Sequence, residues 1–250
     1  STYFAFYGTA IFALPWQVSF ALAIVLTALL GVVIERAAYR PLRNAPRISA
    51  LISAIGVSFL MANLGLVIFG GRPKTFYRPP IFQTPIELGG VRVVALFFVI
   101  PLLTAILLVA LNYIVYKTKT GLAMRAAQWD FDTARLMGVD VDRAISITFA
   151  IGSALAAVGG IMWGLRFAEI NPNMGLFPGL KCFIAAVFGG IGNISGAVLG
   201  GFILGFGEIM LVAFLPGLAG YRDAFAFIVL ILILLVRPTG LLGDKQRVKV

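Results

Sequence analysis

The chain has 250 residues, of which 60% are apolar and 12% charged, with a formal net charge of +10 and a mean hydropathy of +1.01. Soluble domains carry about 25% charged residues, so this composition excludes a single water-facing core and makes lipid the main solvent. The chain lacks histidine, and its only cysteine is Cys182. Disulfide scaffolds, zinc sites and histidine-based acid–base catalysis are therefore excluded.

The first apolar stretch, residues 2–14, is shorter than the roughly 17 to 25 residues that a membrane-spanning helix needs. It lacks the charged start and cleavage site of a signal peptide, so we interpret it as the end of a helix whose beginning is missing. The later apolar runs are counted as crossings, and they are residues 16–34, 48–69, 93–116, 144–165, 180–191, 194–215 and 224–236. The sequence thus predicts one all-α domain over residues 1–250, a polytopic transmembrane bundle of about seven crossings plus the truncated N-terminal helix.

Two segments of this series differ from plain spans. Residues 70–92 are rich in proline and glycine, which predicts an ordered loop. Residues 180–191 are too short for an ordinary span, which predicts a discontinuous helix. After it, glycines recur four residues apart at Gly192, Gly196 and Gly200 and again at Gly201 and Gly205, a spacing that favours close helix packing.

The lysines and arginines lie in the polar gaps between the apolar runs, as in a membrane protein and unlike a nucleic-acid groove. If residues 180–191 cross once, thirteen fall on one side and six on the other, with Lys181 at a boundary. The thirteen are Arg36, Arg40, Arg43, Arg47, Lys117, Lys119, Arg125, Arg135, Arg143, Arg237, Lys245, Arg247 and Lys249, and the six are Arg72, Lys74, Arg78, Arg92, Arg166 and Arg222. The richer side is expected to be cytoplasmic and to hold the C-terminus.

The polar loop at residues 117–143 contains a short helix with its own start and stop signals. Asp130 or Asp132 can cap the N-terminus, residues 133–137 continue the helix, and Gly138 suits a left-handed exit. The pattern predicts a separate helix between two spans.

This short helix carries the apolar side chains of Phe131, Leu136 and Met137, which a solvated loop does not need. We therefore expect it to dock a partner, and the alternative is an ordinary structured loop.

Within the spans, Glu208 is the one acidic residue deep in an apolar run. A charge at membrane depth costs at least about 2.5 to 3.5 kcal/mol unless it is paired or wet. The alternatives for Glu208 are a structural partner such as Arg222, protonation of the carboxylate, or a role in the translocation path. Asn63, Asn193 and Ser195 are weaker path candidates, because amides and hydroxyls commonly make interhelical hydrogen bonds.

No glycine-rich phosphate loop ending in Gly-Lys-Ser/Thr occurs in the sequence. If the chain takes part in ATP-driven transport, the ATPase is a different chain. The sequence predicts no catalytic residue, no metal ligand and no cofactor of its own.

Several stretches, in order, match the pattern of one known family. They are residues 34–43, 51–56, 120–126 with Asp130, Ala134, Leu136, Gly138 and Asp142-Arg143, and residues 170–172, 179–181, 185–187, 189–192 and 237–243. Together they resemble the inner-membrane permeases of ABC importers for branched-chain amino acids, in particular the LivH type. The resemblance covers essentially the whole chain. The family's first helix and the Asn-Phe-Ala-His-Gly-like stretch of its second helix are absent from this sequence.

The resemblance implies a bacterial or archaeal inner-membrane permease that works with partner chains. These are a second, related permease, two ATPases that bind ATP and Mg, and an extracytoplasmic substrate-binding protein. Carried over to this sequence, the coupling helix falls on residues 130–138, with Asp130, Phe131, Arg135, Leu136, Met137 and Gly138 as the residues that contact the ATPase.

Three other functions remain open on the sequence. A urea or short-amide permease shares the same architecture. A secondary transporter or channel needs several ionisable residues within the spans, where only Glu208 lies deep. A passive membrane scaffold is the third. Because the spans hold no dense polar cluster, we expect weak substrate binding by the permease itself.

Overall fold

The computed structural model describes residues 1–42, 45–88, 91–190, 192–237 and 239–243. Expectations that concern Arg43, Ile191, Pro238 and the basic residues after position 243 lie outside this part of the chain. The elements in chain order are α1 (Thr2–Ala10), α2 (Trp16–Ile34), the π-helical turn η1 (Glu35–Tyr39), η2 (Arg40–Leu42), α3 (Arg47–Phe69), β1 (Lys74–Thr75), η3 (Pro80–Phe82), β2 (Pro85–Leu88), β3 (Val91–Val94), α4 (Leu96–Lys117), α5 (Lys119–Trp129), α6 (Phe131–Leu136), α7 (Val141–Phe167), β4 (Glu169–Ile170), α8 (Leu176–Gly189), α9 (Ile194–Phe214), η4 (Pro216–Tyr221) and α10 (Arg222–Val236).

Six of the described helical segments are long and apolar enough to cross a membrane. They are residues 16–42, 48–69, 96–117, 141–167, 194–214 and 219–236. The shorter apolar helix α8 has 14 residues, about 21 Å at the usual rise per residue. The prediction of a polytopic helical membrane protein is confirmed, and a full crossing by α8 stays a prediction.

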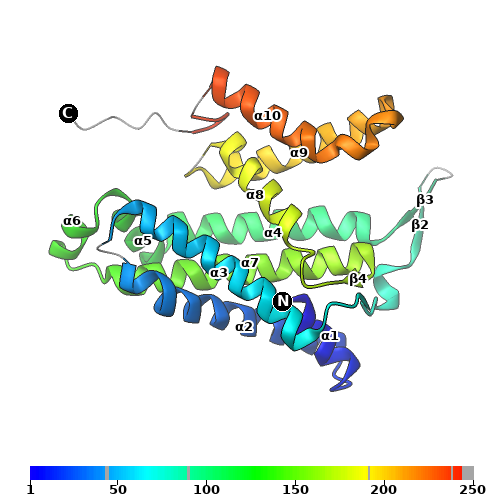
Figure 1. Cartoon of the computed structure of the whole chain (residues 1–250), viewed down its shortest axis with the longest axis horizontal. Helices are drawn as coiled ribbons and strands as arrows, with labels where there is room; N and C mark the ends of the chain where they lie inside the picture. The colour runs from blue at the N-terminus through cyan, green and yellow to red at the C-terminus, as the bar shows by residue number, and fades with distance from the viewer. Residues whose placement is uncertain (43–44, 89–90, 191, 238, 244–250) are drawn as a thin grey trace. The chain divides into compact units, whose positions relative to one another are not determined.

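The chain divides into two compact units, Ser1–Asn173 and Met174–Val250, called unit 1 and unit 2 below. In unit 1, α2 lies along α7. A Cβ on Gly31 would clash with the side chain of Ser153, so a small residue is needed where these helices meet. The loop of α5 and α6 lies at one end of unit 1 and the β2–β3 hairpin at the other (Figure 1).

The proline-rich segment is ordered, as expected, but it contains short strands. β1 pairs antiparallel with β4, with Lys74 opposite Ile170, and β2 pairs with β3, with Pro85 opposite Val94. The sequence interpretation began a span at Val93, whereas α4 begins at Leu96. The error arises because β-branched valines favour strands, and a short apolar run cannot be assigned by its periodicity.

Unit 2 is built on the helix pair α8 and α9, with α10 packed against both. Its core joins Ile184 of α8, Leu204 of α9 and Ala226 of α10. A Cβ on Gly200 would clash with the carbonyl oxygen of Ala185, which confirms close packing at this glycine. Gly205, in contrast, has open space where a Cβ would lie.

Candidate coupling and translocation sites

The short helix α6 is capped as predicted. The Asp130 carboxylate accepts hydrogen bonds from the backbone N–H groups of Asp132 and Thr133, at 2.9 and 3.2 Å. These bonds satisfy donors that a helix N-terminus leaves unpaired. At the other end Gly138 adopts a φ of +81°, the left-handed conformation that favours glycine. Of the two acidic residues considered, Asp130 is therefore the cap.

α6 is anchored by one side and exposes apolar side chains on the other. Ala134 is buried in a small core with Ala127 of α5 and Val141 of α7. Leu136 and Met137 are 88% and 80% exposed, and Phe131 is exposed as well. Exposed apolar side chains that cluster on a capped, anchored helix are typical of an interaction surface.

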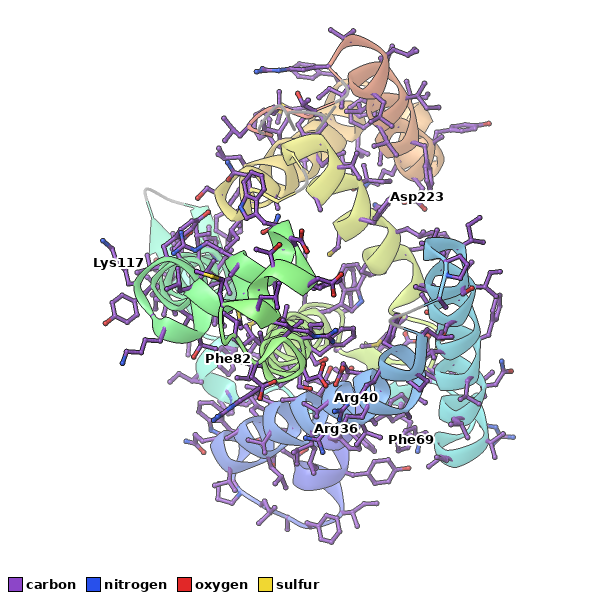
Figure 2. All side chains as sticks on the ribbon, turned by 90° about the vertical axis from the view of Figure 1, so that its left-hand side faces the viewer. Arg36, Arg40, Phe69, Phe82, Lys117 and Asp223 are labelled. Atoms are coloured by element: carbon purple, nitrogen blue, oxygen red, sulfur yellow. The ribbon has the colours of Figure 1, made fainter. Side chains whose placement is uncertain are left out.

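Two ion-pair steps connect α6 with the end of α2. The Arg135 guanidinium on α6 lies 3.6 Å from the Asp142 carboxylate on α7. The same carboxylate pairs with Arg40 at 2.9 Å, and Arg40 follows directly on the π-helical turn after α2. Figure 2 looks onto this end of unit 1 and labels Arg36 and Arg40. The sequence indicated Arg135 but neither its ion-pair partner Asp142 nor Arg40, which pairs with the same carboxylate.

Glu35 was also missed as a candidate residue. It lies in the π-helical turn and is fully buried, and the Ser146 hydroxyl on α7 donates to its Oε2 atom at 2.7 Å. Buried carboxylates need such partners because desolvation of a charge is costly. In the sequence it follows directly on the apolar run of residues 16–34 and stands beside Arg36, so no signal marks it as buried.

In unit 2 the structure gives Glu208 a different partner from the suggested Arg222. The Lys181 ammonium on α8 lies 2.9 Å from the Glu208 carboxylate on α9 and 2.9 Å from Asp223 on α10. Glu208 is mostly buried, with 15% of its side chain exposed. One lysine thus bridges acidic residues from two helices, an arrangement that stabilises charge at membrane depth.

Two of the three weaker path candidates make hydrogen bonds to nearby backbone groups. Asn63 donates to the carbonyl of Phe59 at 2.8 Å within its own helix. The Asn193 side chain caps α9 by accepting from Gly196 N–H at 2.9 Å. Ser195 is exposed in the first turn of α9. Their places favour structural roles for Asn63 and Asn193, and a path role stays a prediction.

Two stretches that are distant in sequence meet at the turn between α8 and α9. Leu241 and Leu242 donate backbone hydrogen bonds to the carbonyls of Phe188 and Gly189, each at 2.9 Å. Asn193 donates to the Leu242 carbonyl at 3.0 Å. The glycines at this turn allow a close approach of two backbones, since a Cβ on Gly190 would clash with the backbone of Gly243.

Comparison with known proteins identifies the family. Residues 2–234 match the family model described as "Branched-chain amino acid transport system / permease component". The chain belongs to this family. It is therefore a membrane permease component of an ABC transport system, a class of subunit that does not itself catalyse a reaction.

The permease component has close relatives of the same kind. It is 41% identical to the high-affinity branched-chain amino acid transport system permease protein LivH of Escherichia coli K12, over 91% of this chain and 74% of that protein. It is 38% identical to BraD of Pseudomonas aeruginosa, over 93% of this chain and 76% of that protein. A probable LivH of Methanocaldococcus jannaschii is 30% identical over 81% of this chain and 59% of its own length. No solved structure matches the chain significantly.

Proposed function

We propose that this permease component forms the translocation path for branched-chain amino acids in an ATP-driven importer. The observation that carries the proposal is the family match, which extends over residues 2–234. The substrate named for the relatives from Escherichia coli and Pseudomonas aeruginosa supports leucine, isoleucine and valine as the transported solutes.

The proposed partners follow from the division of labour in such a system. Two ATP-binding subunits bind ATP and Mg, a second and different permease completes the path, and an extracytoplasmic binding protein delivers the substrate. The chain supplies the membrane part and the surface on which an ATPase acts.

We place the contact with the ATPase on α6, at Asp130, Phe131, Arg135, Leu136, Met137 and Gly138. The exposed Leu136 and Met137 would be covered by the partner, and burial of one such side chain contributes about 1.5 to 3 kcal/mol. The buried Ala134 holds the helix on the rest of unit 1. Movement of the ATPase would therefore be passed to unit 1 instead of bending a free loop.

The ion pairs of Asp142 give this movement a route into the spans. A shift of α6 changes the Arg135 to Asp142 contact, and Asp142 also holds Arg40 at the end of α2. Because α2 packs on α7, the two helices would tilt together as rigid bodies. In this mechanism of alternating access, ATP binding by the partner is converted into a change in helix geometry.

The orientation is part of the proposal. The end of unit 1 that carries α6 also carries Arg36, Arg40 and Arg143, and the excess of basic residues favours the cytoplasm for this end. In the pair of α8 and α9, Gly189 lies against Gly196 and Ala185 against Gly200, so the two helices run antiparallel, which supports a crossing by α8. With that crossing we expect the C-terminus on the cytoplasmic side of the inner membrane.

Uptake competition tests the substrate. The complete importer, reconstituted with its binding protein, should take up labelled leucine, and excess isoleucine or valine should abolish the uptake. Excess urea should leave it unchanged. Competition by urea but not by valine would instead identify the system as a short-amide importer.

Energy coupling is tested separately in liposomes. The purified chain alone should not accumulate leucine in response to a proton or sodium gradient, and accumulation by the full complex should need ATP. Gradient-driven uptake by the chain alone would contradict the proposal and identify a secondary transporter.

A further inference from the structure

A cavity of about 480 Å³ lies within unit 1. Its lining residues belong to elements at the end opposite to α6, and Figure 1 shows the ribbon of that end. Its walls come from η3, β3, the first turns of α4 and the last turn of α7. The volume falls within the range of about 300 to 1,000 Å³ that is usual for ligand sites. Much of the lining is apolar, and it includes Phe82, Val94, Phe97, Ile100 and Leu165.

Three arginines, Arg78, Arg92 and Arg166, supply the charge of this cavity, and none of its described lining residues is acidic. In the described part of the chain, Glu87 is the one carboxylate within ion-pair distance of any of them. It contacts the exposed Arg92 at 2.8 Å. Arg166 places its guanidinium 5.7 Å from the ring of Phe167. The cavity therefore carries an excess of positive charge.

Arg78 adds a second, independent observation. Its Nη2 atom donates to the Arg166 carbonyl at 2.7 Å, which fixes the side chain in place. Its Nε atom is buried and has no hydrogen-bond partner in the described part of the chain. An unmade hydrogen bond of a buried donor costs about 1 to 3 kcal/mol, so a ligand acceptor that reached this atom after a shift of the groups that now cover it would be stabilising.

The position of the cavity indicates which kind of ligand would bind there. The first turns of α4 and the last turn of α7 are the ends of membrane spans, where lipid phosphates lie in a bilayer. Phe97 is exposed on α4, so the apolar wall continues onto the outer surface of this span. Arginine is well suited to phosphate because its planar group donates several parallel hydrogen bonds.

We propose that this cavity binds an anionic phospholipid. The phosphate accepts from Arg78 and Arg166, and an acyl chain lies along the apolar side of α4. An anionic headgroup is favoured over a zwitterionic one because it offsets the excess positive charge. The site is independent of the transported solute, so it holds whether or not the substrate proposed above is correct.

Native mass spectrometry of the full chain tests this site. The chain is purified from bilayers that contain equal amounts of phosphatidylglycerol and phosphatidylethanolamine. The wild type should retain phosphatidylglycerol in preference, and Arg78→Gln or Arg166→Gln should weaken its binding about tenfold, as expected for one charge-assisted hydrogen bond. Arg72→Gln is the matched control, because Arg72 lies in the same connecting segment outside the cavity lining, and it should bind like the wild type.

Several outcomes would overturn the lipid site. If the wild type retains the two lipids equally, the proposed preference for an anionic phospholipid is wrong. If both arginine variants keep wild-type thermal stability and bind phosphatidylglycerol as the wild type does, the lipid does not bind through these arginines. Loss of binding-protein docking together with unchanged lipid binding would assign the cavity to a protein partner.

Discussion

Lys181 and Glu208 form an ion pair of 2.9 Å between α8 and α9. The pair continues a series of contacts along the two helices, in which Gly189 lies against Gly196 and Ala185 against Gly200. Sequence numbers rise on α9 as they fall on α8, so the helices run antiparallel. Asp223 of α10 contacts the same ammonium, and the lysine therefore joins the three helices of unit 2.

Loss of this lysine should destabilise the protein through Glu208. We expect Lys181→Met to lower the free energy of unfolding by about 3 kcal/mol, because a mostly buried carboxylate loses its cation. The additional change Glu208→Gln should recover part of the loss. Thermal unfolding in detergent of both single variants and the double variant gives the coupling energy, expected at about 0.5 to 3 kcal/mol. Strict additivity of the two single effects would show that the pair contributes nothing.

Leu136 should be needed for docking of the ATPase and not for folding. Leu136→Asp removes an exposed apolar contact and adds a charge, so we expect complex assembly and transport to fall at least tenfold while membrane insertion is unchanged. Leu136→Ser separates lost apolar area from added charge. Thr133→Asp is the control, since it adds the same charge to an exposed site near the helix N-terminus, where acidic residues are favourable. Wild-type assembly and transport in Leu136→Asp would rule out docking through this residue.

Asp142 should couple ATP hydrolysis to transport. Asp142→Asn weakens the contacts with Arg40 and Arg135, and the effect on stability should be small because exposed ion pairs contribute about 0.2 to 1 kcal/mol. We expect the number of leucine molecules moved per ATP hydrolysed to fall severalfold in the assembled importer. Asp140→Asn is the matched control, because asparagine also caps a helix. An unchanged ratio in Asp142→Asn would show that the ion pairs do not pass on the movement of α6.

Gly200 and Gly205 lie on the same helix and should respond oppositely to alanine. Gly200→Ala forces a Cβ against the Ala185 carbonyl, and overpacking of this kind costs about 1 to 3 kcal/mol. Gly205→Ala meets open space and should be neutral or stabilising by up to about 1 kcal/mol, through its higher helix propensity. Thermal unfolding of the two variants measures both effects. Equal destabilisation would contradict the close approach of α8 and α9 at Gly200.

Much of the architecture could be predicted because its signals are local. Long apolar runs define spans by their length, and Asp130 and Gly138 mark the ends of α6 through capping chemistry that acts within a few residues. The helix α5 was missed inside the loop at residues 117–143, since its mean polarity resembles that of a loop. The strands β2 and β3 were missed because each is only four residues long.

The sequence by itself determined that the chain is a membrane protein, that it lacks an ATPase motif, and that a capped helix with apolar residues lies between two spans. Composition, run length and helix caps are properties of neighbouring residues, so no folding is needed to see them. Only the tertiary structure decided that Glu208 pairs with Lys181, that Asp142 joins Arg135 to Arg40, and that three arginines share one cavity. Each of these depends on the register and rotation of helices distant in sequence, which packing sets.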